Sequence, residues 1–175
     1  PLTDWKRTWR LARSRGLGPE LTIFILRMLW GLIPTRARLH RILPLAYNSP
    51  DCQLCETVPR GTPETALHAL LSCEANLDLP ARVLRTLWRY QPGAELVCIL
   101  TLDLEVEPSL ELPFTWLIGS LLSSIWTQRD NRRVDLIRTR AELEAKCRLL
   151  RDCKVKTWKN AHVQTRDLVS QLFSA

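Results

Sequence analysis

Apolar side chains recur every three or four residues along most of the chain, and this spacing places them on one face of an α-helix. The repeat predicts a mainly α protein, a helical bundle with little or no sheet. The expected helices lie within 1–18 and over 19–32, 36–43, 63–71, 80–91, 114–128, 132–154 and 155–173. Two of them, 19–32 and 114–128, are apolar on most sides, which is typical of helices at the centre of a core.

Residues 95–107 do not fit the helical repeat. Apolar side chains alternate imperfectly with others from Leu96 to Val106, between Pro92 and Pro108. Alternation is the pattern of a half-buried strand, whereas prolines and acidic side chains are typical of an irregular linker. Both interpretations remain open, and the helical surroundings favour the linker.

One short stretch combines the side chains of a metal site with the start of a helix. Its ligands are spaced Cys52-x2-Cys55-x12-His68-x4-Cys73. Thiolate and imidazole are donors that Zn²⁺ binds in tetrahedral sites, and a Cys-x2-Cys turn can offer both sulfurs to one ion. Gly61 permits a turn, and Thr62 suits the N-cap of a helix. Pro63 and Glu64 suit its first turn, so this helix is expected to deliver His68.

Other interpretations exist for the parts of this stretch. A Cys-x2-Cys pair alone is compatible with a redox pair or a disulfide, and a histidine alone with an ordinary buried side chain. Together the four groups favour one structural zinc ion per chain. Four protein ligands leave no open position for catalysis, and Leu70 stands where a zinc deaminase needs His-x-Glu. The remaining cysteines, Cys98, Cys147 and Cys153, are expected to be ordinary thiols.

Charge is distributed unevenly along the 175 residues, which carry a net charge of +7. Residues 1–45 have nine Lys and Arg against two Asp and Glu, residues 46–126 four against ten, and residues 127–175 twelve against six. Basic segments on both sides of a metal site indicate a polyanion as partner. The competing interpretation is that these arginines are simply solvated on helix surfaces.

The composition is that of a globular protein, with 46% apolar and 25% charged residues. The most apolar run, 21–33, contains Arg27 and is too short to span a membrane, so no membrane partner is expected. Six cysteines without a signal peptide favour a reducing compartment. The sequence starts at Pro1 without methionine, and we expect it to be a piece of a longer protein. The expected organisation is one continuous domain with basic helices over 1–50, a zinc knuckle over 51–78 and a helical bundle over 79–175.

The first helix interleaves Trp5 and Trp9 with arginine and lysine. Aromatic side chains among cations can stack on the bases of single-stranded nucleic acid. Tryptophans also dock surface helices on a core, and the sequence alone favours this second interpretation.

A resemblance to a known family rests on two stretches, "RMLWGLIPTRARLHRI" and, after a loop, the cysteine cluster with "ETALHALLSC". They resemble the zinc-binding segment of non-LTR (LINE-type) retrotransposon reverse transcriptases. The matching features are the Pro34-Thr35-Arg36 turn, the basic helix, the cysteine pair, and Glu64 four residues before His68. The likeness covers 20–75 best, and "PFTWLIGSLLSSIWTQRDN" resembles a later helix of such proteins. The loop before His68 is somewhat longer than in the family pattern, and loops absorb insertions.

The resemblance implies a C-terminal domain downstream of the polymerase in a retrotransposon polyprotein, acting in target-primed reverse transcription. Its implied partners are RNA and/or DNA and the upstream polymerase domain, and its implied location is nuclear, with a cytoplasmic ribonucleoprotein stage. The candidate nucleic-acid contacts are Arg36, Arg38, His40, Arg41, Arg129, Arg132 and Arg133. The alternative is a zinc-stapled interaction module that docks on the polymerase or a host factor. We expect no enzyme activity, because the sequence shows no nucleophile triad, paired carboxylates or phosphate-binding glycine loop.

Overall fold

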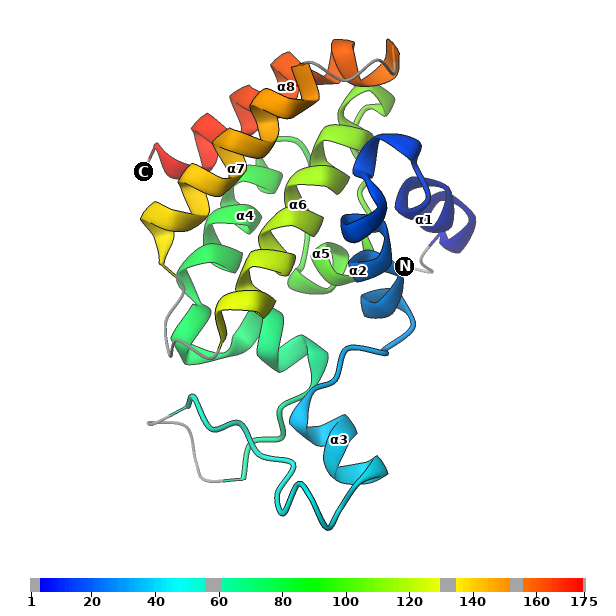
Figure 1. Ribbon diagram of the computed structural model, residues 1–175. Coiled ribbons are helices and arrows are strands. Elements are labelled where there is room, and N and C mark those ends of the chain that lie inside the picture. Colours follow the sequence, from blue (N-terminus) through cyan, green and yellow to red (C-terminus); the bar gives the residue numbers. More distant parts are fainter. Residues whose placement is uncertain (1–3, 56–60, 130–134, 152–155, 175) are drawn as a thin grey trace.

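The structure, a computed structural model, describes residues 4–55, 61–129, 135–151 and 156–174 (Figure 1). Eight α-helices lie in these ranges: α1 (Trp5–Ala12), α2 (Pro19–Leu29), α3 (Arg36–Ile42), α4 (Asp78–Trp88), α5 (Leu96–Thr101), α6 (Pro108–Gln128), α7 (Leu136–Arg151) and α8 (Lys156–Phe173). Within the described residues, β-type pairing is limited to one isolated bridge, Asp51 to Pro63. The predicted mainly α fold without a sheet is confirmed.

Helix α6 is the centre of the bundle, and α1, α2, α7 and α8 pack around it (Figure 1). Its sequence explains this place, because apolar side chains occur on all sides of it and Phe114, Leu117 and Leu121 are fully buried. Gly119 lets α2 approach closely. A Cβ atom at Gly119 would lie 2.7 Å from Cδ1 of the buried Ile25.

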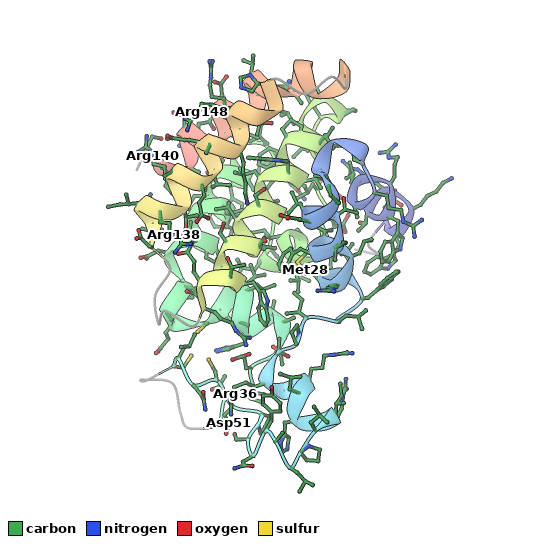
Figure 2. The ribbon with its side chains drawn as sticks, in the orientation of Figure 1. Met28, Arg36, Asp51, Arg138, Arg140 and Arg148 are labelled. Carbon is green, nitrogen blue, oxygen red and sulfur yellow. The ribbon has the colours of Figure 1, made fainter. Side chains whose placement is uncertain are left out.

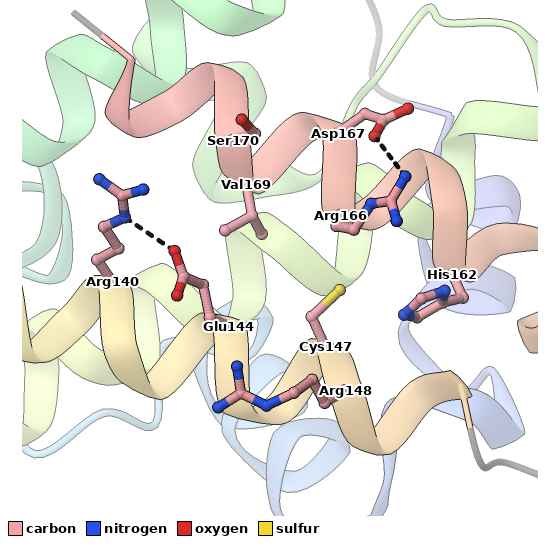
Figure 3. A pocket seen from close by; sticks show the side chains of 9 residues that line it. All are labelled: Arg140, Glu144, Cys147, Arg148, His162, Arg166, Asp167, Val169 and Ser170. Atoms are coloured by element: carbon pink, nitrogen blue, oxygen red, sulfur yellow. Dashed lines mark hydrogen bonds and ion pairs between the residues drawn. The ribbon is translucent and has the colours of Figure 1, made fainter.

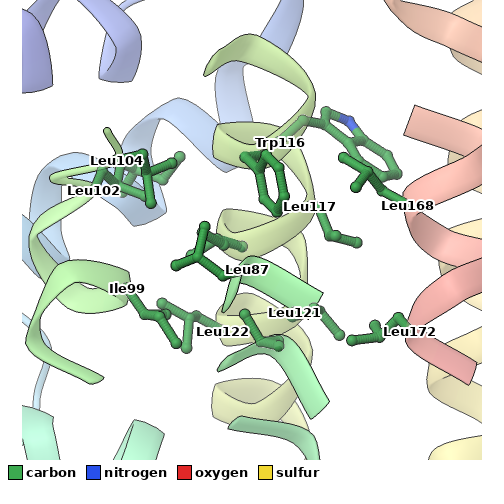
Figure 4. Packing of buried hydrophobic residues seen from close by; sticks show 14 of the residues in the cluster. Leu87, Ile99, Leu102, Leu104, Trp116, Leu117, Leu121, Leu122, Leu168 and Leu172 are labelled. Atoms are coloured by element: carbon green, nitrogen blue, oxygen red, sulfur yellow. The ribbon is translucent and has the colours of Figure 1, made fainter. Parts of the chain in front are cut away.

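One cluster of buried apolar residues extends from Ala12 to Leu172 along the chain (Figure 4). Figure 4 shows Leu87 and Ile99 facing α6 from one side and Leu168 and Leu172 from α8 on the other. The core therefore joins helices from both ends of the sequence. Among the described helices, none is both long enough and apolar enough to cross a membrane.

Residues 95–107 are neither a strand nor a continuous irregular linker, so both sequence interpretations are wrong. Residues 96–101 form helix α5, which buries Ile99 and packs on α2 and α4. The helix ends at Leu102, which is fully buried in a left-handed conformation with φ of 54°. Such a conformation costs about 1 to 3 kcal/mol for a non-glycine residue, and burial of this leucine holds it in place.

Helix α6 begins at Pro108, six residues before the start expected at 114. Pro108 stands in its first turn, where a missing N–H costs nothing, while Pro113 lies inside the helix and is buried. Packing on the bundle compensates for the hydrogen bond that Pro113 cannot donate.

Helix α1 buries Thr8, Leu11 and Ala12 against the bundle, while Trp9 is half-buried beside Trp30 at the end of α2. The Thr8 hydroxyl donates to the Thr101 carbonyl oxygen at 3.2 Å. Trp5 remains 47% exposed. The interpretation that the tryptophans dock this helix on the core is therefore wrong for Trp5.

Helix α3 and the loops around the cysteine cluster form a separate layer at one end of the bundle (Figure 1). We call the described residues 35–55 and 61–73 the metal lobe. The position of α3 in the sequence is as predicted, with Thr35 as N-cap and its hydroxyl accepting the Arg38 N–H at 3.4 Å. No residue of α3 is buried, and Ile42, expected on its apolar side, is 53% exposed.

Candidate metal centre

The ligand atoms of Cys52, Cys55, His68 and Cys73 all lie within 4.8 Å of one another. The sulfur of Cys73 is 3.8 Å from that of Cys52 and 3.7 Å from that of Cys55. Two sulfurs bound tetrahedrally to one Zn²⁺ at ~2.3 Å lie about 3.8 Å apart. Nε2 of His68 lies 3.2 Å from the Cys55 sulfur, so the imidazole belongs to the same cluster of ligand atoms. The four residues form a group suited to one metal ion, and this donor set fits zinc.

Two strand-like hydrogen bonds bring the halves of the site together. The Cys52 N–H donates to the Thr62 carbonyl at 2.9 Å, and the Glu64 N–H donates to the Pro50 carbonyl at 2.9 Å. These bonds flank the bridge between Asp51 and Pro63. The cysteine turn is thereby fixed beside the segment that leads to His68.

The helix that carries His68 starts later than the sequence suggested. The helical residues begin at Ala66, and the Thr65 hydroxyl accepts the His68 N–H at 3.1 Å. The cap is thus Thr65, and the expected roles of Thr62 and Pro63 as N-cap and first helical residue are wrong. Pro63 lies in the β-bridge instead.

Residues His68–Ser72 form a π-helical turn, with four of the five residues buried. A π-turn widens the helix by one residue per turn and is frequent at functional sites. Here it lets His68 face the cysteines while Leu70 and Leu71 enter the core of the bundle. Cys73 follows in extended backbone, which ends the helix at the fourth ligand.

Burial sets the proton affinities of the ligands. It raises the pKa of the Cys73 thiol to about 12 and also raises the pKa of Cys52. The pKa of His68 is lowered by burial, against an opposing effect of the carboxylates of Glu64 and Glu74. Neutral imidazole is ready to bind a metal, but these two thiols hold their protons until a metal displaces them.

Glu64 connects the metal lobe to the bundle. Its buried carboxylate oxygen Oε1 accepts the backbone N–H of Arg36 at 3.1 Å and Nη1 of Arg129 at 3.1 Å. Its own carbonyl accepts the Ala37 N–H at 3.3 Å. A carboxylate at the start of α3 also complements the helix dipole. The sequence predicts Glu64 only as a residue in the first turn of a helix, and its position four residues before His68 is part of the resemblance; neither indicates this role.

The expected nucleic-acid contacts lie in different surroundings. Arg41 is exposed, and Arg36 is half-buried with its Nε buried and unpartnered among the described residues. Arg38 donates to the Gly31 carbonyl at 3.0 Å, and Nδ1 of His40 lies 2.5 Å from the Tyr47 carbonyl oxygen. These four residues share helix α3 and form one group (Figure 2 shows Arg36 in the metal lobe).

The second expected group is not described as a whole. Arg129 pairs with Glu64 and also lies over the ring of Trp126, 3.9 Å from its centroid. Arg132 and Arg133 lie outside the described residues. Arg129 therefore has an ion-pair partner, Glu64, inside the protein. Because Glu64 also binds the backbone N–H of Arg36, it connects Arg129 to the first group.

No family model matches the chain, and the searches of curated proteins and of solved structures find no match either.

Proposed function

We propose that this chain is a non-catalytic nucleic-acid-binding domain in which one structural zinc ion fixes a basic helix. The proposed zinc is held by the three cysteines and His68, and the contacts come from Arg36, Arg38, His40 and Arg41. The resemblance extends this proposal to a place in a retrotransposon polyprotein, downstream of its polymerase. There the domain would hold element RNA or target DNA during target-primed reverse transcription.

The observation that carries the proposal is the anchoring of α3. Its first N–H groups are bound by the buried Glu64 carboxylate and the Thr35 hydroxyl, and Glu64 lies four residues before the metal ligand His68. Within the described residues, Arg36, Arg38 and Arg41 form no ion pair with an acidic side chain. Their charges are therefore available to phosphates, on a helix whose position the metal site determines.

Arg129 contributes differently in this proposal. It is ion-paired to the same carboxylate that binds α3, and its side chain is only 23% exposed. We assign it the role of positioning the metal lobe on α6. Direct contact with nucleic acid is left to the arginines of α3.

Binding measured at several salt concentrations tests the proposal. The chain with Arg36, Arg38 and Arg41 replaced by alanine should bind RNA and DNA more weakly, whatever their sequence. Because each neutralised phosphate contributes about 0.7 to 0.9 to the slope of log affinity against log salt, loss of two or three contacts should flatten that slope.

A control of equal charge comes from helix α7, where Arg138, Arg140 and Arg148 are exposed (Figure 2). Arg138 pairs with Glu142, and Arg140 pairs with Glu144 (Figure 3). Replacing these three residues by alanine changes the net charge equally and should leave a steeper slope than the α3 variant. Zinc content and helicity should be unchanged in both variants. Equal affinity of the α3 variant and the unmodified chain at every salt concentration would end the proposal for this helix.

The second candidate function is a protein-interaction module. The apolar side chains of Ile42, Leu43 and Leu45 are exposed beside the basic surface, and Leu45 is 98% exposed. Exposed leucine and isoleucine at a loop indicate a protein contact more than a phosphate contact. In that case, replacing Leu43 and Leu45 by serine would abolish association with the polymerase domain, while nucleic-acid affinity would not respond to the arginine variant.

A further inference from the structure

Three tryptophans form a row on the outer surface of α1 and the end of α2. The rings of Trp5 and Trp9 are stacked, with centroids 6.3 Å apart and an interplanar angle of 30°. Trp9 and Trp30 follow with centroids 5.6 Å apart and a tilt of 46°. Trp5 stands at the start of α1 and Trp30 directly after α2, and these helices lie side by side (Figure 1). We call Trp5, Trp9 and Trp30 the tryptophan row.

None of the three tryptophans belongs to the buried apolar core, and Trp9 is half-buried between the other two rings. Trp5 is 47% exposed and Trp30 56%, while the buried face of α1 is formed by Thr8, Leu11 and Ala12. Leaving large apolar rings in water costs free energy, so a row of them on one surface marks an interaction site.

The charges around the tryptophan row favour a polyanion. The guanidinium of Arg13 lies over the ring of Trp9 at 5.9 Å from its centroid, and Lys6 is exposed on the same helix. Neither residue forms an ion pair within the described part of the chain. Two acidic side chains contact α1, and both are engaged: Asp4 caps the helix by accepting the Arg7 N–H at 3.1 Å, and Glu111 pairs with Arg7 and Arg10.

The tryptophan row is also connected to the basic helix. Trp30 is followed by Gly31, whose carbonyl oxygen accepts a hydrogen bond from Arg38 of α3 at 3.0 Å. Gly31 has a positive φ of 62°, which turns the chain from α2 toward the metal lobe. One end of the row therefore meets the arginines proposed to contact phosphates.

We propose that the tryptophan row is a stacking platform for the unpaired bases of a single-stranded nucleic acid. Aromatic faces with neighbouring cations bind single strands without regard to sequence, because every base has a face that can stack. The backbone of the same strand would continue onto α3. This inference rests on the proposed function and deepens it, because paired bases in a duplex cannot reach the rings.

The test compares two single strands of equal length, a thymidine oligonucleotide and an abasic strand with the same phosphates. The unmodified chain should bind the thymidine strand about tenfold or more tightly, because stacking on one aromatic residue already changes affinity by about fivefold or more. The double variant Trp5→Leu and Trp30→Leu should lose this preference and bind both strands like the abasic one. Trp5→Phe with Trp30→Phe should retain most of it.

Trp88 provides the matched control, since it is 49% exposed on α4 and its indole N–H donates to the Ala94 carbonyl at 2.7 Å. Trp88→Leu should keep the preference for the thymidine strand. Circular dichroism and zinc content of all variants verify that they are folded.

Each other outcome has a distinct meaning. If the unmodified chain binds both strands equally and with salt dependence, or if the double variant weakens both strands alike, the stacking platform is refuted and the proposed function stands. If Trp88→Leu is as damaging as the double variant, the platform is also refuted. If the unmodified chain binds neither strand nor a duplex at low salt, both the platform and the proposed function fall, and a protein partner for the tryptophan row becomes the better account.

Discussion

The bundle and the metal lobe are stabilised by different means. In the bundle, α6 is buried along most of its length, and apolar residues from six other helices pack against it or against each other. In the metal lobe, α3 has no buried residue at all, and its connections are polar. They are the Glu64 carboxylate, the Thr35 hydroxyl and the hydrogen bond from the Ala37 N–H to the Glu64 carbonyl. The hydrophobic effect therefore stabilises the bundle, together with Leu70 and Leu71 at the edge of the lobe, whereas α3 depends on a few specific polar interactions.

This contrast explains how one chain can combine a stable scaffold with a polar surface. If α3 were held in place by burial of an apolar face, the protein would need further apolar residues to pack against that face. Here the Glu64 carboxylate and the Thr35 hydroxyl hold α3, whose residues are half-buried or exposed, with Arg41 and Ile42 exposed to a partner. The following predictions separate the two regions by the size and the place of the effect.

The largest effect is expected from loss of a metal ligand. Cys73→Ser should abolish stoichiometric zinc binding, because structural zinc in small domains contributes about 10 to 16 kcal/mol of apparent binding free energy. Elemental analysis of protein purified without chelator measures this directly. Cys98→Ser, a cysteine outside the cluster, serves as control and should keep one zinc per chain. Absence of zinc from the unmodified chain would refute the metal site.

The next effect concerns the bundle alone. Leu117→Ala removes a fully buried side chain from α6 and should lower the free energy of unfolding by about 2 to 5 kcal/mol. Denaturant unfolding followed by circular dichroism measures the loss. The folded fraction should still bind one zinc ion. A variant that loses zinc while its helices stay folded would show that the lobe and the bundle are not separable.

Zinc affinity should depend on pH in the lobe. Burial raises the pKa values of Cys73, to about 12, and of Cys52, so both thiols are protonated in the empty site between pH 6 and pH 8. Zinc must displace these protons, and affinity should therefore fall about tenfold per displaced proton for each pH unit of acidification. Competition with a chromophoric chelator at several pH values measures the slope. Affinity independent of pH over this range contradicts the assignment of these thiols as ligands.

A smaller effect is expected at the connection between the regions. Glu64→Gln keeps the size of the side chain but removes the charge that pairs with Arg129, and should cost about 1 to 3 kcal/mol. The loss should appear in the lobe as faster proteolysis around α3, with zinc content retained. Glu95→Gln, at an exposed carboxylate without a side-chain cap bond, is the control and should have no effect. Equal protease resistance of both variants would remove Glu64 from its proposed role.

The sequence predicted what depends on local spacing. The four ligand residues were identified because tetrahedral chemistry restricts their types and separations, and α3 because Thr35 and the arginines after it have clear positions. Helix α5 was missed because six residues are too few to distinguish a period of 3.6 from a period of two.

Long-range contacts were beyond sequence analysis. The role of Glu64 depends on Arg129, 65 residues away, and no local pattern indicates this pair. The exposure of Trp5 and Trp30 follows from the choice of Thr8, Leu11 and Ala12 as the packing face of α1. Thr8 and Ala12 are small and allow α1 to pack closely on the bundle, which a periodicity of large apolar residues does not reveal.

Hydrogen exchange with and without zinc tests the central claim most directly, that the metal positions the basic helix while the bundle is independent of it. Removal of zinc should speed the exchange of the Leu39 and Leu43 amides of the α3 region by about tenfold or more, since opening of the lobe no longer has to break metal bonds. The amides of α6 should keep their protection. Unchanged exchange in α3, or an equal loss of protection in α3 and α6, would contradict the account.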